Sequence, residues 1–441
     1  MSGSAKKKTE APEAKVLAMH PAFLAGEQAK PALRQVHEAG IRRFETLGFP
    51  HKKHEMFTFV NTHELAETPF QLANGGPVDT AWVQSRVYPA CTRSVLVFVD
   101  SAYQENLSNL SALGDGFKVQ CLSEAIADPE IKSVLVDSLE NENDVFATLN
   151  SAFLEHGVLI DIPAKAVMEA PVQLLYVSTG SSSGPVVSHP RVVVRLGETA
   201  ELKLIPVYAG VRGQYCVNAV MDVIVKDGAS VTFSQVQKDE AQSWHVSKTR
   251  VRLQRDARFY GRNASCGNRL TRHHYEVRLK DEGAEAILNG ASVLVSDEQV
   301  HNFIRIHHEA PHCTSHQLFK NVINDKGRSS FDGTVIVDQG AQQTYSDQLI
   351  NNLMLSDEAH ADNKPNLMIF ADDVKCSHGA TVGQIDEDQL FYLKTRGLSG
   401  EVAQALLTTS FVDSLIQTVP FPDVVADLEE ILLKKLEAKH A

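Results

Sequence analysis

The chain has 441 residues, of which 43% are hydrophobic and 22% are charged, a composition typical of a folded globular protein. Its 55 acidic and 42 basic side chains give a formal net charge of −13, which argues against a general nucleic-acid binder because such a protein presents a basic surface. The first 16 residues carry lysines but no apolar segment of a secretory signal, and no apolar run approaches the length of a membrane span. We therefore expect a cytoplasmic protein without nucleic-acid or membrane partners.

Six cysteines are scattered along the chain, and no two of them have the C-x-x-C spacing of a zinc ribbon or a thioredoxin motif. They are Cys91, Cys121, Cys216, Cys266, Cys313 and Cys376. Such wide scatter in a large chain favours free thiols in a reducing compartment over a disulfide framework.

The N-terminal part of the chain has a mixed pattern. Residues 1–16 are polar and rich in lysine, glutamate and proline, and we expect them to be disordered. A helical rhythm of apolar residues follows over 31–47. Residues 51–170 mix short strands with helical pieces, one of which spans 144–154. We therefore predict a helical and mixed region over 17–170.

From about residue 171 the chain is rich in short β-branched segments, several of which alternate with polar residues. Four alanines recur at spacings of 29, 28 and 27 residues, and two glycines then recur at a spacing of 13. The alanines are Ala200, Ala229, Ala257 and Ala284, and the glycines are Gly327 and Gly340. A turn-and-strand unit at a steady period predicts a β-solenoid core over 171–385, although an antiparallel sandwich also gives regular strand spacing.

Residues 386–441 return to a helical pattern. Val402, Leu406 and Phe411 mark one broad apolar face, and a second amphipathic stripe follows over 424–436. A helical segment after a β core either caps the solenoid or offers a docking surface, and the sequence alone leaves both interpretations open.

Histidines gather between residues 301 and 316. Within this segment, HEAPH at 308–312 matches the H-E-x-x-H zinc pattern, but that pattern requires a helix and Pro311 prevents one. The wider group has residue types that bind transition metals, yet no spacing defines one closed site. A metal-dependent β-helix enzyme is the alternative function that this group supports. Its members are His301, His307, His308, His312, Cys313 and His316.

Two further polar segments are not predicted to form a binding or catalytic site. The segment 180–185, GSSSGP, lacks the G-K-[ST] ending of a P-loop, and no such ending occurs anywhere in the chain. We therefore expect no ATP site in this chain, so that a partner must hydrolyse any ATP used. The segment 51–55, HKKHE, is interpreted as a solvated turn because it follows a proline and holds two lysines between its histidines.

The segment DDVKCSHGATVG at 372–383 places a thiol and an imidazole two residues apart. If it is a strand, Cys376 and His378 project from one face, with Lys375 and Ser377 on the other. Thiolate and imidazole both suit iron and zinc, so the pair could contribute to a metal site. The alternative is structural, with the cysteine as a small core residue and the histidine as a hydrogen-bonded strand residue.

Six pieces of sequence follow one another at 328–333, 341–344, 351–356, 365–369, 372–383 and 389–397. Together they resemble the SufB/SufD family, the paired scaffold subunits of the SUF iron–sulfur cluster assembly system. The close resemblance covers about residues 320–400 and extends loosely over most of the chain. Within the family, the sequence VKCSHGAT resembles the SufD type, because Gly379 stands where SufB-type chains have a glutamate.

The resemblance implies a right-handed parallel β-helix core with flanking N-terminal and C-terminal helical regions, in agreement with the alanine repeat. It implies a heterodimer with SufB and docking of the SufC ATPase on the C-terminal helices, where we predict contacts at Leu406 and Phe411. It also implies cluster assembly at the SufB–SufD interface. His378 matches the SufD histidine implicated there, and Cys376 is its neighbour, so both are our predicted metal or cluster ligands.

The expected function is thus a non-catalytic scaffold that contributes to a transient iron–sulfur cluster at the interface with SufB. A cluster normally takes several thiolates, and Cys376 with His378 makes only part of a site, so a partner has to complete it. A SufB-type, sulfur-accepting subunit is the alternative within the family, disfavoured by the few cysteines and by Gly379. A flavin in the complex and a homodimer of the isolated chain are left open.

Overall fold

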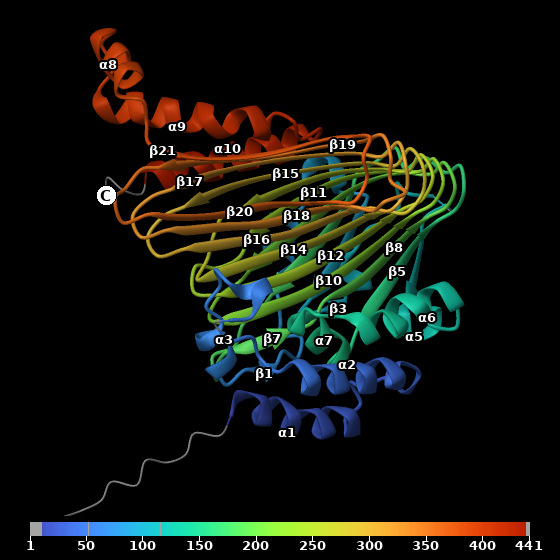
Figure 1. The fold of residues 1–441 in the computed structure, drawn as a ribbon. Helices are drawn as coiled ribbons and strands as arrows, with labels where there is room; N and C mark the ends of the chain where they lie inside the picture. The colour runs from blue at the N-terminus through green and yellow to red at the C-terminus, as the bar shows by residue number, and fades with distance from the viewer. Residues whose placement is uncertain (1–10, 52, 115, 438–441) are drawn as a thin grey trace, which may run out of the picture.

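The computed structural model describes residues 11–437, except residues 52 and 115. Two parallel β-sheets are wound from one chain into a β-helix, and helices from both ends of the chain lie against it (Figure 1). The parallel β-helix predicted from the sequence is confirmed, because successive strands alternate between the two sheets. Among the described helices, none is both long and apolar enough to cross a membrane.

Short helices make up most of the N-terminal region. They are α1 (Pro12–Ala25), η1 (Pro31–Leu33), α2 (Arg34–Leu47), η2 (Glu55–Phe57), α3 (His63–Glu67), α4 (Thr80–Gln84), η3 (Pro89–Cys91), η4 (Glu105–Leu107), α5 (Leu122–Ala125), α6 (Pro129–Leu135), η5 (Asp137–Asn141) and α7 (Val145–Ala152). Residues 12–16, which we expected to be disordered, begin α1, since Val16 packs against the apolar cluster around Phe23. Ala11 precedes the first turn of α1, and residues 1–10 of that expectation lie outside the described residues.

The first sheet, sheet A, runs in the order β20-β18-β16-β14-β12-β10-β8-β5-β4, with β1 and β7 beside β10. Its strands are β1 (Gln71–Leu72), β4 (Lys118–Cys121), β5 (Gly157–Ile162), β7 (Val186–Ser188), β8 (Arg191–Leu196), β10 (Tyr215–Val225), β12 (Trp244–Leu253), β14 (Leu270–Leu279), β16 (Gln299–His308), β18 (Arg328–Val337) and β20 (His360–Ile369). Only the terminal pair β4–β5 is antiparallel.

The second sheet, sheet B, runs in the order β21-β19-β17-β15-β13-β11-β9-β6-β2-β3. Its strands are β2 (Val95–Val99), β3 (Ala102–Tyr103), β6 (Val172–Ser178), β9 (Glu201–Gly210), β11 (Ser230–Lys238), β13 (Arg258–Ser265), β15 (Glu285–Leu294), β17 (Thr314–Ile323), β19 (Thr344–Met354) and β21 (Val374–Gly383). Both sheets therefore begin before residue 171, and the last strand ends shortly before the C-terminal helices.

One corner of the β-helix explains the alanine repeat. At six successive turns this corner has a residue with positive φ, followed by a small buried side chain that precedes or begins a strand of sheet B. The positive-φ residues are Thr199, Gly228, Asp256, Gly283, His312 and Gln343, and the small residues are Ala200, Ala229, Ala257, Ala284, Cys313 and Thr344. The backbone N–H of each positive-φ residue donates to a carbonyl of the next turn, as from Gly228 to Arg255 at 2.8 Å. The repeat thus continues through Cys313 and Thr344, and not through Gly327 and Gly340.

Apolar side chains from both sheets fill the interior of the β-helix. Phe233 lies 5.6 Å from Phe259, and Phe319 lies 4.9 Å from Phe331, measured between ring centroids. Full burial of each such ring stabilises the fold by about 1.5–3 kcal/mol. The interior is therefore a packed core, and strand alternation decides which side chains enter it.

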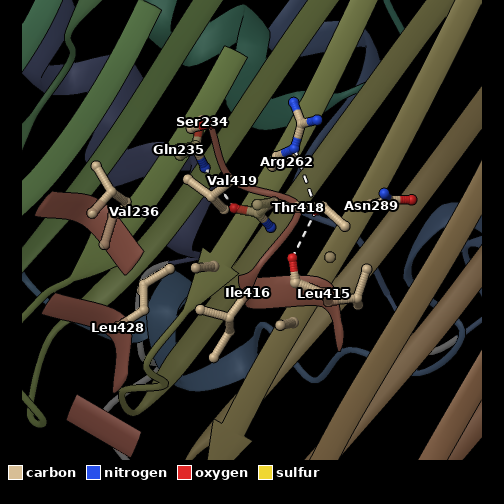
Figure 2. Close-up of a pocket in the computed structure, with 15 residues that line it drawn as sticks. Ser234, Gln235, Val236, Arg262, Asn289, Leu415, Ile416, Thr418, Val419 and Leu428 are labelled. Atoms are coloured by element: carbon tan, nitrogen blue, oxygen red, sulfur yellow. Dashed lines mark hydrogen bonds between the residues drawn. The ribbon is translucent and has the colours of Figure 1, made fainter. Parts of the chain in front are cut away.

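Three C-terminal helices follow: α8 (Glu387–Thr395), α9 (Gly400–Ile416) and α10 (Pro422–Glu437). The last two cover the outer face of sheet B (Figure 1). Figure 2 shows part of this contact, where Ile416 and Leu428 belong to one apolar cluster with Val236 of β11, and Arg262 Nε donates to Thr418 Oγ1 at 3.4 Å. These helices therefore cap a sheet face, and not the last turn of the β-helix.

The two ends of the β-helix differ. At the N-terminal end, the short antiparallel strands β3 and β4 finish the sheets, and α5 and α6 pack beside them. At the other end, no strand of the described chain pairs with the outer edges of β20 and β21. Large apolar side chains are exposed there: Tyr345, Leu349, Met368, Ile369, Phe370 and Val382. We call this surface the open end.

Candidate functional site

The segment DDVKCSHGATVG supplies the last strand of sheet B. Along β21, Cys376 pairs in register with Ser346 of β19, and His378 pairs with Gln348. Ser346 and Gln348 are both 1% exposed and face the interior. Since register partners share a face in a parallel sheet, Cys376 and His378 occupy interior-facing positions of the final turn. No further turn covers this one, so His378 is exposed and Cys376 is half-buried.

Two ladders of polar side chains lead through the interior to these residues. Ser315 and Ser346 share a hydrogen bond of 2.9 Å between their hydroxyls, below Cys376. Gln348 Nε2 donates to Gln317 Oε1 at 3.0 Å, below His378. The buried Oε1 atom of Gln348 has no hydrogen-bond partner in the described part of the chain. Gln348 Oε1, on the strand next to that of His378, is therefore available as a hydrogen-bond acceptor for the imidazole.

The thiol of Cys376 lies beside the small apolar cluster at the end of the core. Partial burial raises the pKa of the Cys376 thiol, and a backbone hydrogen bond at Ser346 opposes that rise only in part. The thiol form thus predominates at neutral pH. Because the thiolate is the form that binds a metal, a metal or cluster has to displace the proton.

The donor set at this end is incomplete as a metal or cluster site. No group of three or more His, Cys, Asp or Glu side chains with metal-binding geometry occurs among residues 11–437, leaving aside 52 and 115. Iron–sulfur clusters are usually held by four protein ligands. Cys376 and His378 suit iron by residue type, but the remaining donors would have to come from another chain.

The histidine-rich segment 301–316 does not form a site. His301 points outward from sheet A and bonds Ser330 Oγ at 2.7 Å, whereas His308 points into the core and bonds Ser315 Oγ at 2.9 Å. Burial lowers the pKa of His301 to about 3 and that of His308 to about 4. His316 lies on sheet B and pairs with Asp347. The metal-enzyme interpretation therefore has no convergent ligand set.

The rest of that segment is accounted for by the β-helix corner. The HEAPH motif runs from the end of β16 into the turn, as expected from Pro311, and is not helical. His312 takes the positive-φ position, and the buried Cys313 takes the place of a corner alanine. His307 pairs with Asp338 at 2.8 Å on the outer surface.

The two predicted contacts on α9 lie in different surroundings. Leu406 is 48% exposed. Phe411 is half-buried against sheet B, where Lys320 Nζ lies 5.0 Å from the centre of its ring and also donates to its carbonyl oxygen at 2.7 Å. Other exposed apolar side chains on α8 and α9 are Phe391, Tyr392 and Val402.

Sequence reasoning did not identify the apolar side chains of the open end. Met368 and Ile369 end β20, and Phe370, which follows them, is 59% exposed. The available signal was the run LMIF at 367–370, which breaks the alternation expected of a half-buried strand.

Comparison with known proteins gives the family. The description "SUF system FeS cluster assembly, SufBD core domain" matches residues 176–411, and "SufBD protein N-terminal region" matches residues 21–174. The chain belongs to the SufBD family. It is therefore a member of a family of iron–sulfur cluster assembly subunits that generally act as scaffolds.

Curated relatives from several organisms agree with this assignment. The chain is 29% identical over 376 residues to the iron–sulfur cluster assembly protein SufD of Escherichia coli, covering 84% of this chain and 86% of that one. It is 28% identical to an iron–sulfur cluster assembly SufBD family protein of Synechocystis, covering 87% of each. It is 29% identical to protein ABCI7, chloroplastic, of Arabidopsis thaliana, covering 88% of this chain and 83% of the relative.

Proposed function

We propose that this chain is the SufD-type scaffold of an iron–sulfur cluster assembly complex, and that it presents Cys376 and His378 to SufB at its open end. The observation that carries the proposal is the position of this pair on the final turn, where the described chain offers no third donor. The cluster is cargo, assembled across two chains. Relatives named SufD support the subunit type.

The open end suits a partner that has β-strands of its own. An unpaired strand edge offers backbone donors and acceptors to another strand, and folded proteins usually protect such edges. Here the edges of β20 and β21 are accompanied by Phe370 and Val382, 59% and 56% exposed. Strand addition by SufB would satisfy the edges and bury these side chains in one step.

The interior below His378 offers it one acceptor. Gln348 Oε1 has no partner in the described chain and belongs to the residue that pairs in register with His378. In the complex, this oxygen would accept the N–H of one ring nitrogen and leave the lone pair of the other nitrogen directed toward SufB. A metal-ligating histidine commonly has such an arrangement, because the second hydrogen bond fixes its tautomer. Cys376 then loses its proton as iron binds, so that the two side chains supply one imidazole and one thiolate.

The test is anaerobic co-purification of this chain with SufB and SufC, followed by analysis of iron and sulfide. We expect His378→Ala to assemble the complex but to lose most of its iron and sulfide, and Cys376→Ala to lose less, since its side chain is half-buried. Ser377→Ala is the matched control, because Ser377 lies on the same strand with its side chain on the opposite face. Equal iron content in His378→Ala and Ser377→Ala would show that the segment 372–383 has only a structural role.

Complex formation is measured separately in the same preparation. If this chain forms a homodimer and does not associate with SufB, the open end serves self-association and the proposal fails at its first step. Full occupancy by iron without SufB would also contradict it, because the site would then be complete in one chain.

We further propose that α8 and α9 dock the SufC ATPase. The supporting observation is the exposed apolar surface of Phe391, Tyr392, Val402 and Leu406, on helices that stand outside the β-helix (Figure 1). Leu406→Asp should weaken SufC binding by about tenfold or more, whereas Val167→Asp, at an equally exposed apolar position elsewhere, should not. Phe411→Asp is a poorer test, since Phe411 packs against sheet B and its loss would loosen α9 itself.

A further inference from the structure

A polar recess lies between the N-terminal region and the outer face of sheet A. It has a volume of about 500 Å³, within the usual range for small-ligand sites. Alternate residues of β12 and β14 form its floor, Arg305 of β16 extends that floor, and η5 with the residues after it forms one wall. Cys376 and His378 do not line it, so the recess is separate from the open end.

The charge of the recess is opposite to that of the whole chain. Five cationic side chains line it against three carboxylates, although the protein has a net charge of −13. The cations are Lys248, Arg250, Arg252, Arg278 and Arg305, and the carboxylates are Glu55, Glu142 and Glu276. An excess of positive charge in a partly enclosed space concentrates anions.

Ion pairs within the protein use only some of these cations. Lys248 Nζ lies 2.7 Å from Glu142 Oε1, and Arg250 Nη1 lies 3.2 Å from the other oxygen of the same carboxylate. Arg278 pairs with Glu309 at 2.5 Å. These three cations therefore have carboxylate partners.

Arg252 and Arg305 are different. Neither makes a hydrogen bond or an ion pair with any described residue. Arg252 interacts with Asp222, and Arg305 with Asp332, only through longer-range electrostatics. The guanidinium carbon of Arg305 also lies 5.0 Å from the centre of the Phe303 ring. A half-buried guanidinium has five N–H donors in a planar arrangement that suits two oxygens of a phosphate. Two such groups face one recess from β12 and β16, the strands on either side of β14.

Two imidazoles add unpaired polar atoms to the lining. His274 is buried and places Nδ1 2.7 Å from Asp144 Oδ2, while its Nε2 has no partner in the described chain. Burial lowers the pKa of His274 to about 4, so the ring is neutral and Nε2 is an acceptor. Nδ1 of His54 is likewise buried without a partner. A ligand that fits has an anionic group for the arginines and a hydroxyl for an imidazole.

We propose that this recess binds a phosphate-bearing small molecule, with Arg252 and Arg305 as the phosphate ligands. The source is either free inorganic phosphate or the phosphate ester of a hydroxylated compound, and the two share the same anionic group. The segment 51–55, which the sequence suggested to be only a solvated turn, contributes the wall that bears His54 and Glu55.

The test is isothermal titration calorimetry on the full chain with inorganic phosphate, ribose 5-phosphate and ribose. We expect one of the two phosphates to bind with a Kd below about 1 mM, and ribose not to bind. Tighter binding of ribose 5-phosphate identifies the ester, and equal binding identifies the inorganic anion; both outcomes support the phosphate site. Failure of both phosphates to bind overturns it.

Variants locate the binding. Arg252→Gln with Arg305→Gln should weaken phosphate binding by about tenfold or more, because charged hydrogen bonds are lost. Arg212→Gln removes an exposed arginine of the β9–β10 turn and should change nothing. Arg252→Lys should retain part of the affinity through its charge. Undiminished affinity in the double variant would place the phosphate elsewhere and contradict the proposal. Since neither arginine makes a hydrogen bond or an ion pair with a described residue, the double variant should unfold within about 1 kcal/mol of the native chain.

Discussion

The N-terminal half of the β-helix and its last turn are built from the same repeating unit, yet they treat polar side chains in opposite ways. In the N-terminal half, charges on the outer face of sheet A are buried and paired, as between Arg191 Nη2 and Asp222 Oδ2 at 2.8 Å. In the last turn, strand edges and aromatic side chains are exposed, and His378 has no protein partner among the described residues. A covered charge needs an internal partner, whereas an uncovered edge is available to another chain.

The two regions therefore have different roles, one in folding stability and the other in association. The covered half is held by contacts whose loss should reduce folding stability, while changes at the open end should alter association and leave stability unchanged. Loss of a buried ion pair therefore reports on the covered half, and loss of an exposed apolar side chain reports on the open end.

The largest effect is expected at Asp144, in the covered half. Its carboxylate is 1% exposed, caps α7 through Phe146 N, and lies 2.6 Å from Arg272 Nη1. Although burial alone would raise it, Arg272 holds the pKa of Asp144 well below its usual range. Asp144→Asn keeps the cap but leaves Arg272 as an uncompensated buried charge. Urea unfolding should show a loss of about 3–5 kcal/mol.

The control for this change lies at the open end. Asp372 is exposed, and Asp372→Asn should change the free energy of unfolding by less than about 0.5 kcal/mol. If both variants lose similar stability, the two ends do not differ in the way proposed, and the charge layer under the N-terminal region is not what holds it.

The second effect concerns association at the open end. Phe370→Asp should raise the Kd for SufB at least about tenfold, because a desolvated aromatic side chain is replaced by a charge. It should leave binding of SufC and the unfolding midpoint unchanged, since Phe370 is 59% exposed in this chain. Binding to each partner can be measured by biolayer interferometry.

Phe391→Asp on α8 is the matched variant, because Phe391 is 68% exposed and lies away from the strand edges. It should weaken SufC binding and spare SufB binding. If Phe370→Asp and Phe391→Asp both weaken binding of the same partner, the open end and the surface of α8 and α9 are parts of one binding surface and not two.

The sequence predicted the repeating unit well because each turn repeats the same physical requirement. A corner with positive φ has room for a small side chain, so Ala200 and Ala229 recur at the length of one turn. Cys313 and Thr344 satisfy the same requirement with different residues, which is why an alanine count loses the repeat there.

Surface roles were harder to predict, for a reason that lies in the alternation itself. Cys376 on β21 and Ser346 on β19 share the same inward position, and alternation alone does not say that only one of them lacks a covering turn. The same limit applies to Phe411, which helical spacing groups with Leu406 but which packs against Lys320 of a distant strand. His54 was assigned to solvent because the contacts that half-bury it come from residues remote in sequence.

The smallest effect is a pH dependence in the covered half. His189 is buried, stacks on Phe153 with ring centroids 5.7 Å apart, and has a pKa lowered by burial from 6.5 to about 3. Between these two values the unfolded chain binds a proton that the folded chain does not. The contribution to stability is therefore complete above pH 6.5 and falls with decreasing pH by about 1.4 kcal/mol per pH unit.

His189→Gln should remove this contribution to the acid slope while retaining a hydrogen bond to Asn218, so the comparison concerns slopes and not absolute stabilities. Urea midpoints measured at several pH values below 6.5 should decline less steeply in the variant than in the native chain. The control His360→Gln removes an exposed imidazole on β20, at the open end, and should leave the slope as it is, because water solvates that ring in both states. An equally flattened slope in His360→Gln would show that burial does not distinguish His189 from His360. The difference between the two regions would then rest on ion pairs such as Asp144–Arg272 and not on burial in general.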